Sequence, residues 1–145
     1  MGIFYLMYKI LLILILLLSN LFSSNIPNNI SWYHSYDKAL ITAQKEKKNL
    51  MLFIASSKNN NSNEILKKYF LNQEYIEYIN KNFVSVLITV EHKTSYPIEL
   101  FYTTNFPSIF FASYKDESYL THPIYKFNSK EEFLNTLYSI DLKTK

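Results

Sequence analysis

The sequence has no cysteine and a single glycine, Gly2, among its 145 residues. Without a thiol the chain cannot form a disulfide or a mixed disulfide, which excludes dithiol exchange by its own side chains. It also excludes lipoprotein processing, which needs a cysteine after the apolar N-terminal run. A folded domain without glycine has no glycine-rich phosphate loop, so nucleotide sites of the Walker and dinucleotide types are excluded. Its turns must rely on asparagine, aspartate and serine.

Arginine is absent as well, so all 15 basic residues are lysine, and the net charge is +3. The lysines are interspersed with acidic residues, as in residues 45–48 and 115–117, and form no basic stripe. We therefore expect no nucleic-acid partner. His34, His92 and His122 lie far apart with no metal-ligand spacing, so neither a metal site nor a cofactor is expected.

The N-terminus has the residue pattern of a targeting signal. A short segment ending in Lys9 precedes nine consecutive aliphatic residues, 10–18, and then a serine-rich stretch. This pattern predicts a secretory signal peptide over residues 1–24. The alternative is an uncleaved anchor in the inner membrane, because about 20 apolar residues span a bilayer. In either case we expect a periplasmic or otherwise exported domain, with membrane contact only through residues 1–24 if they are retained.

The remainder predicts one domain. Residues 25–30 contain Pro27 and are expected to be a linker, residues 31–141 a single folded domain, and residues 142–145 a tail. The expected strands are residues 31–33, 50–55, 83–90, 108–113 and 119–127. The expected helices are residues 36–47 capped by Ser35, residues 64–82 with a break near Asn72, residues 97–103, and a last helix capped by Ser129 with Glu131 or Glu132 reaching back. This order predicts an α/β fold with a parallel pair and an antiparallel hairpin.

That order, with Phe106 and Pro107 just before the expected hairpin, resembles the thioredoxin-like fold family, in particular the periplasmic thioredoxin-related proteins. The resemblance covers about residues 31–140 and rests on the order and spacing of several segments. These are Trp32, residues 37–43, 47–50, 65–76, 82–84, 106–111 and 131–137. It implies a three-layer α/β/α sandwich around a central mixed sheet of four to five strands. It also implies descent from thiol-disulfide oxidoreductases.

The chain departs from that family where the family carries a Cys-x-x-Cys pair, in the turn after the strand at 50–55. Counting back from the following helix places the two cysteine positions at Asn60 and Asn63. Counting forward from the strand places them at Lys58 and Asn61. Neither register supplies a sulfur, so we expect a degenerate active-site turn and no redox enzyme. Ser62 or Asn63 is expected to cap the helix that follows.

The resemblance implies that Pro107 is a cis proline facing this turn, although the residues alone also fit a trans proline at the start of a strand. Phe106, Pro107 and Ser108 would then line a groove for an extended peptide. The function expected from the sequence is that of an exported, non-catalytic module that binds a protein or peptide. The alternatives are an accessory subunit of a periplasmic thiol-disulfide oxidoreductase system and a degenerate structural paralogue.

Overall fold

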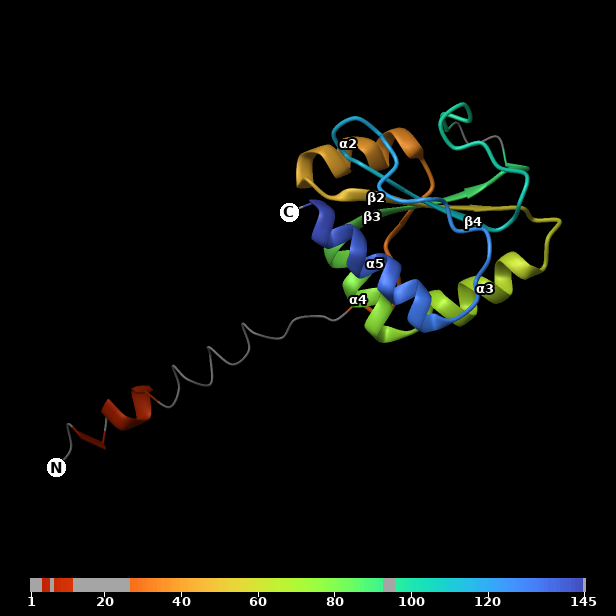
Figure 1. Ribbon diagram of the computed structural model, residues 1–145. Helices are drawn as coiled ribbons and strands as arrows, with labels where there is room; N and C mark the ends of the chain where they lie inside the picture. Colours follow the sequence, from red (N-terminus) through yellow and green to blue (C-terminus); the bar gives the residue numbers. More distant parts are fainter. Residues whose placement is uncertain (1–3, 6, 12–26, 93–95, 145) are drawn as a thin grey trace.

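The computed structural model describes residues 4–5, 7–11, 27–92 and 96–144, and it shows one sheet with helices on both of its faces (Figure 1). In chain order the elements are β1 (Trp32–Tyr33), α2 (Tyr36–Glu46), β2 (Asn49–Ala55), α3 (Asn61–Phe70), α4 (Gln73–Asn82), β3 (Phe83–Thr89), β4 (Ser108–Ala112) and α5 (Lys130–Thr144). Most of the predicted N-terminal segment 1–24 lies outside the described residues. Among the residues that are described, no helix is long and apolar enough to cross a membrane.

The sheet has four strands in the order β1-β3-β2-β4. Strand β3 is parallel to both β1 and β2, whereas β4 is antiparallel to β2. Helix α2 covers one face, and α3, α4 and α5 cover the other (Figure 1). The structure thus confirms the predicted three-layer sandwich and its mixed sheet.

Strand β2 is the centre of the core because alternate side chains point to opposite faces of a sheet. Leu50, Leu52 and Ile54 are fully buried against α2. Met51 and Phe53 are fully buried on the other face, against α3, α4 and α5. This double burial explains why the strand reads as a continuous apolar run rather than as an alternating one.

An aromatic chain crosses the face covered by α3, α4 and α5. The Phe53 ring lies 6.1 Å from Trp32 and 5.5 Å from Phe70, and Phe70 lies 5.4 Å from Phe133 on α5. All three contacts are edge-to-face, the arrangement that aromatic pairs prefer. These rings join β1, β2, α3 and α5 into one core.

Three helix starts agree with the sequence. The Ser35 hydroxyl caps α2 by accepting from the Lys38 amide, and the Asn72 side chain caps α4 at the predicted break. Ser129 caps α5, its hydroxyl accepting from the Glu132 amide at 3.0 Å. The sequence predicted that Glu131 or Glu132 would reach back to a free backbone amide at the start of the helix. Instead, the Glu132 carboxylate accepts from the Asn128 side chain.

Two predicted elements do not form. Residues 97–103 are not a helix, because only the Leu100 and Phe101 amides bond back to the Pro97 carbonyl, which closes a single turn. Residues 119–127 are not a strand and pair with β4 through two isolated bridges, Ile109 with Ile124 and Ala112 with Tyr119. The two bridges are out of register, because two residues separate them on β4 and four separate them on the other segment, so no continuous ladder forms.

The described residues include no glycine, and two of them take the left-handed conformation. Lys47 ends α2 with φ 54°, and its amide bonds to the Ala43 carbonyl. Glu117 has φ 60° in the turn that follows β4. Glycine reaches this region without steric strain, whereas a residue with a Cβ atom does not.

Candidate functional site

The turn between β2 and α3 is built around two side chains, Ser56 and Asn59. The Lys58 amide donates to the Ser56 hydroxyl at 3.3 Å, and the Asn59 amide donates to the Ser56 carbonyl at 3.1 Å. The Asn59 side-chain oxygen then accepts from the Asn61 amide at 2.9 Å. Side-chain hydrogen bonds of a serine and an asparagine thus close this turn, at a place where other proteins often use glycine.

Asn59 also connects this turn to the loop that carries Pro107. Its side-chain nitrogen donates to the Phe106 carbonyl at 2.7 Å, next to the Phe106–Pro107 peptide bond, which is cis. The structure therefore brings the asparagine turn and the proline loop together. Asn59 belongs to neither of the two cysteine registers read from the sequence, and no local pattern marks it, because its partner lies 47 residues away.

Helix α3 begins at Asn61, three residues earlier than the sequence predicts. The expected cap is wrong, because Ser62 and Asn63 both lie inside the first turn and Asn59 bonds the Asn61 amide instead. Ser62 is buried, and among the described residues its hydroxyl has no hydrogen-bond partner. The four predicted residues of the degenerate turn are all exposed to solvent. They are Lys58, Asn60, Asn61 and Asn63.

Glu91 holds the other side of the turn, and the sequence analysis did not identify it. Its carboxylate accepts from the Ser56 hydroxyl and, at 2.8 Å, from the Ser57 amide. These two bonds, the hydroxyl contributing most, lower the pKa of Glu91 from 4.5 to about 2. Glu91 lies just beyond β3, where the Val90 amide still pairs with the Ala55 carbonyl. The position is thus set by the parallel pairing of β2 and β3.

The three residues predicted to line a peptide groove differ in exposure. Pro107 and Ser108 are buried, and only Phe106 is partly exposed. The Ser108 hydroxyl bonds to the Asn105 carbonyl and lies 3.0 Å from the Thr103 hydroxyl, so it closes the loop from inside. The Phe106 side chain packs against the core on the α2 face. Of this predicted groove, Phe106 alone presents side-chain surface to a partner.

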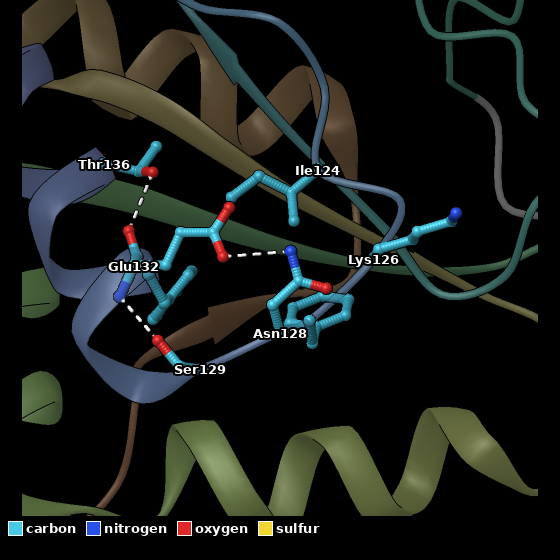
Figure 2. Close-up of a pocket in the computed structure, with 8 residues that line it drawn as sticks. Ile124, Lys126, Asn128, Ser129, Glu132 and Thr136 are labelled. Atoms are coloured by element: carbon cyan, nitrogen blue, oxygen red, sulfur yellow. Dashed lines mark hydrogen bonds between the residues drawn. The ribbon is translucent and has the colours of Figure 1, made fainter.

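Within the described ranges, no three histidine or acidic residues gather as metal ligands. A small cavity of about 30 Å³ lies beside the start of α5, where Asn128 and Glu132 bond to each other and the Lys126 side chain extends away (Figure 2). That volume has room for water and not for a substrate.

The sequence matches no family model and no curated protein. The structure is similar to several solved ones. A thioredoxin from Thermus thermophilus aligns with a TM-score of 0.67 at 16% identity, covering 80% of this chain and 90% of that one. The DsbH oxidoreductase aligns with a TM-score of 0.65 at 15% identity, covering 81% and 88%.

Thioredoxin O2 from Arabidopsis thaliana aligns with a TM-score of 0.54 at 12% identity, covering 79% of this chain and 96% of that one. At such low identities these similarities establish the fold and not the activity. The Phe106–Pro107 loop faces the β2–α3 turn, and that turn contains no sulfur. The chain therefore has the thioredoxin fold without a Cys-x-x-Cys pair.

Proposed function

We propose that this chain is an exported, thioredoxin-fold protein that binds a protein or peptide partner and catalyses no thiol chemistry. The binding surface comprises the exposed turn residues Lys58, Asn60 and Asn63 together with Phe106. The observation that carries the proposal is the Asn59 side chain, which holds the turn against the proline loop although the turn contains no sulfur. A surface that is ordered by its own hydrogen bonds binds at a lower entropic cost than a flexible one.

The groups at this surface favour binding over catalysis. Ser56 is buried and its hydroxyl already donates to Glu91, so it is not an available nucleophile. A carboxylate with a pKa of about 2 is too weak a base for proton abstraction near neutral pH. The exposed asparagine amides offer hydrogen-bond donors and acceptors but have no acid–base chemistry in this range.

The partner would be recognised through side chains rather than by strand addition. The Phe106 carbonyl is already bonded to Asn59. The outer edge of β4 is bonded as well, since Ile109 exchanges two hydrogen bonds with Ile124 and the Phe111 carbonyl accepts from Leu120. An extended peptide would have to displace these bonds before it could pair with the backbone.

Site-specific photo-crosslinking in cells tests this proposal. A photoreactive residue at Asn60 is expected to capture a discrete partner, whereas the same residue at Glu77, exposed on α4, is not. Phe106→Ala should weaken the capture. Because Phe106 also packs on the core, Lys58→Ala serves as a second variant at an exposed position. Equal capture from Asn60 and Glu77, or capture that neither variant weakens, would overturn the proposal.

The identity of the captured protein separates the proposal from its alternatives. A captured thiol oxidoreductase whose turnover rises when this chain is added would support the accessory-subunit function. If no position captures a partner, a degenerate paralogue with a structural role is the remaining alternative. The purified chain should reduce no insulin in either case, and measurable turnover would contradict the absence of thiol chemistry.

Export is the remaining part of the proposal, and it rests on the apolar segment at residues 10–18. Fractionation of the native host should place the protein outside the cytoplasm. N-terminal sequencing of that fraction should find a start near residue 25 if the segment is cleaved, and Met1 or Gly2 if it is retained as an anchor. Recovery of the intact chain from the cytoplasm would contradict export.

A further inference from the structure

Asn59 and Ser62 are three residues apart at the start of α3, the spacing of a Cys-x-x-Cys pair, and they differ in exposure. Asn59 is partly exposed, whereas Ser62 is 3% exposed. The two pairs read from the sequence are instead exposed at both positions: Lys58 with Asn61, and Asn60 with Asn63. A thiol that attacks a disulfide has to be accessible, whereas the thiol that resolves the mixed disulfide can lie behind it. Of the three pairs, the 59–62 pair has that asymmetry.

The Ser62 hydroxyl lies in a place that suits a sulfur atom better than an oxygen. It is buried, and within the described part of the chain it has no hydrogen-bond partner. A buried hydroxyl without a partner costs free energy, because it has lost its bonds to water. A thiol at the same position is a small apolar group with a weak donor, so its burial costs little. The unpartnered hydroxyl therefore indicates a niche that fits a thiol.

Asn59 contacts both the proline loop and the other member of the pair. Its side-chain nitrogen donates to the Phe106 carbonyl at 2.7 Å, and its own carbonyl accepts from the Ser62 amide at 3.1 Å. A hydrogen bond of this kind, from a residue to the third one before it, is typical of turns whose end Cα atoms lie within about 7 Å of each other. A disulfide joins Cα atoms that are roughly 4.4–6.8 Å apart. Positions 59 and 62 therefore have the separation that a disulfide needs.

The start of α3 favours a thiolate at position 59. The helix has 10 residues, and Asn60, which precedes it, makes no capping bond through its side chain. The positive end of the helix dipole stabilises an anion placed next to it, and this lowers the pKa of a thiol at that place. The Asn61 amide, which now donates to the Asn59 side chain, becomes available to a sulfur in its place.

We propose that Asn59 and Ser62 occupy the two positions of a Cys-x-x-Cys pair, and that the turn around them is still a built site for exchange with a protein disulfide. The site lacks its two sulfur atoms. The Asn59 side chain also occupies the Phe106 carbonyl, so its replacement frees a backbone acceptor for the substrate chain. This inference rests on the geometry of the turn and does not depend on the proposed partner binding.

The double variant Asn59→Cys/Ser62→Cys supplies the missing atoms. In its reduced form, the thiolate at position 59 attacks one sulfur of an insulin disulfide and releases an insulin thiolate. The thiol at position 62 then gives up its proton and attacks the mixed disulfide, which releases the second insulin thiolate and leaves a disulfide between positions 59 and 62. Two electrons pass to insulin, and the two protons lost by the chain bind to the insulin thiolates. Dithiothreitol restores the dithiol and is itself oxidised to its cyclic disulfide.

Insulin reduction by three matched double variants tests the register. Asn59→Cys/Ser62→Cys should reduce insulin about tenfold faster than dithiothreitol alone, to which the unmodified chain should add nothing. The control variants carry two cysteines at the same spacing in the other registers, and they should stay near the rate of dithiothreitol: Lys58→Cys/Asn61→Cys and Asn60→Cys/Asn63→Cys. Equal or faster turnover in a control would overturn the proposal. So would a 59–62 variant that forms its disulfide by mass spectrometry and yet does not exceed the rate of dithiothreitol, or one that folds and forms no disulfide.

A single variant keeps the test valid if loss of the Asn59 bonds unfolds the double variant. Ser62→Cys should raise the urea midpoint above that of the unmodified chain, because it removes a buried hydroxyl without a partner. Its thiol should react with a maleimide only when urea unfolds the chain, whereas that of Asn63→Cys, at an exposed position, should react at once. A lowered midpoint, or equal labelling of the two variants in the folded state, would show that position 62 is not built for a shielded thiol.

Discussion

At the scale of single residues, Asn59 joins the two loops of the candidate site through both ends of its amide. One end accepts from the Asn61 amide and the other donates to the Phe106 carbonyl. Its neighbour Asn60 is exposed and, although it precedes α3, makes no capping bond through its side chain. Two adjacent asparagines of the same run therefore have different functions, one structural and one available to solvent.

We expect Asn59→Ala to lower the free energy of unfolding by about 1–3 kcal/mol, because it leaves the Phe106 carbonyl without its partner. Asn60→Ala should change it by less than about 0.5 kcal/mol, as is usual for exposed positions. Urea denaturation followed by the fluorescence of Trp32, the single tryptophan, measures both. Equal effects of the two variants would show that the Asn59 bonds contribute nothing to stability.

Glu91 gives the turn a dependence on pH. Its pKa is lowered from 4.5 to about 2 in the folded state, so the carboxylate stabilises the fold above about pH 4.5. This contribution should be lost as the pH falls through the interval down to about 2. Glu91→Gln keeps an acceptor for Ser57 but has no proton to gain, so its urea midpoint should vary less across that interval than that of the unmodified chain. If the urea midpoints of the variant and of the unmodified chain changed equally with pH, Glu91 would not be the source of the pH dependence.

These residue-level features were the least predictable from sequence. The turn residues remain a prediction as a binding site, and both cysteine registers omitted Asn59, whose partner Phe106 lies far away in the sequence. The helix begins early since the Asn59 side chain, rather than Ser62 or Asn63, bonds the Asn61 amide. Glu91 was missed for a related reason, because its partners come from another strand end.

At the scale of elements, the signals that worked were local ones. The apolar runs at β2 and β3 predicted those strands to within one residue, and Ser35, Asn72 and Ser129 marked helix starts where their side chains bond free amides. The failures involved competition between local preference and tertiary pairing. A strand was predicted over residues 119–127, and the segment instead pairs with β4 through two bridges that are out of register with each other.

The cap of α4 offers a test at this scale. The Asn72 side chain accepts from the Glu74 amide at 3.0 Å, so Asn72→Ala should lower the free energy of unfolding by about 1 kcal/mol. Asn72→Asp retains the acceptor oxygen and should restore most of that stability. Thermal melts of the two variants distinguish them, and an aspartate variant as unstable as the alanine one would argue against capping as the cause.

At the scale of the whole molecule, the order of elements was sufficient to predict the fold, while the chemistry had to be inferred from what the fold lacks. The fold as a whole is similar to that of thioredoxins of 12–16% identity. The core depends on size and apolar character, which many sequences supply. A functional surface depends on particular atoms, and here the sulfur atoms are missing.

The left-handed Lys47 that ends α2 limits how stable this fold can be. Replacing it with glycine removes the Cβ contact and should raise the free energy of unfolding by roughly 0.5–1 kcal/mol. Lys45→Gly, which removes the same charge from the last turn of α2, should instead lower it by about 1 kcal/mol. Matching changes in both melts would show that charge, and not backbone geometry, sets the effect. A chain that uses no glycine in its folded domain thus retains strain that one substitution can relieve, and its composition rather than its architecture restricts its thermal tolerance.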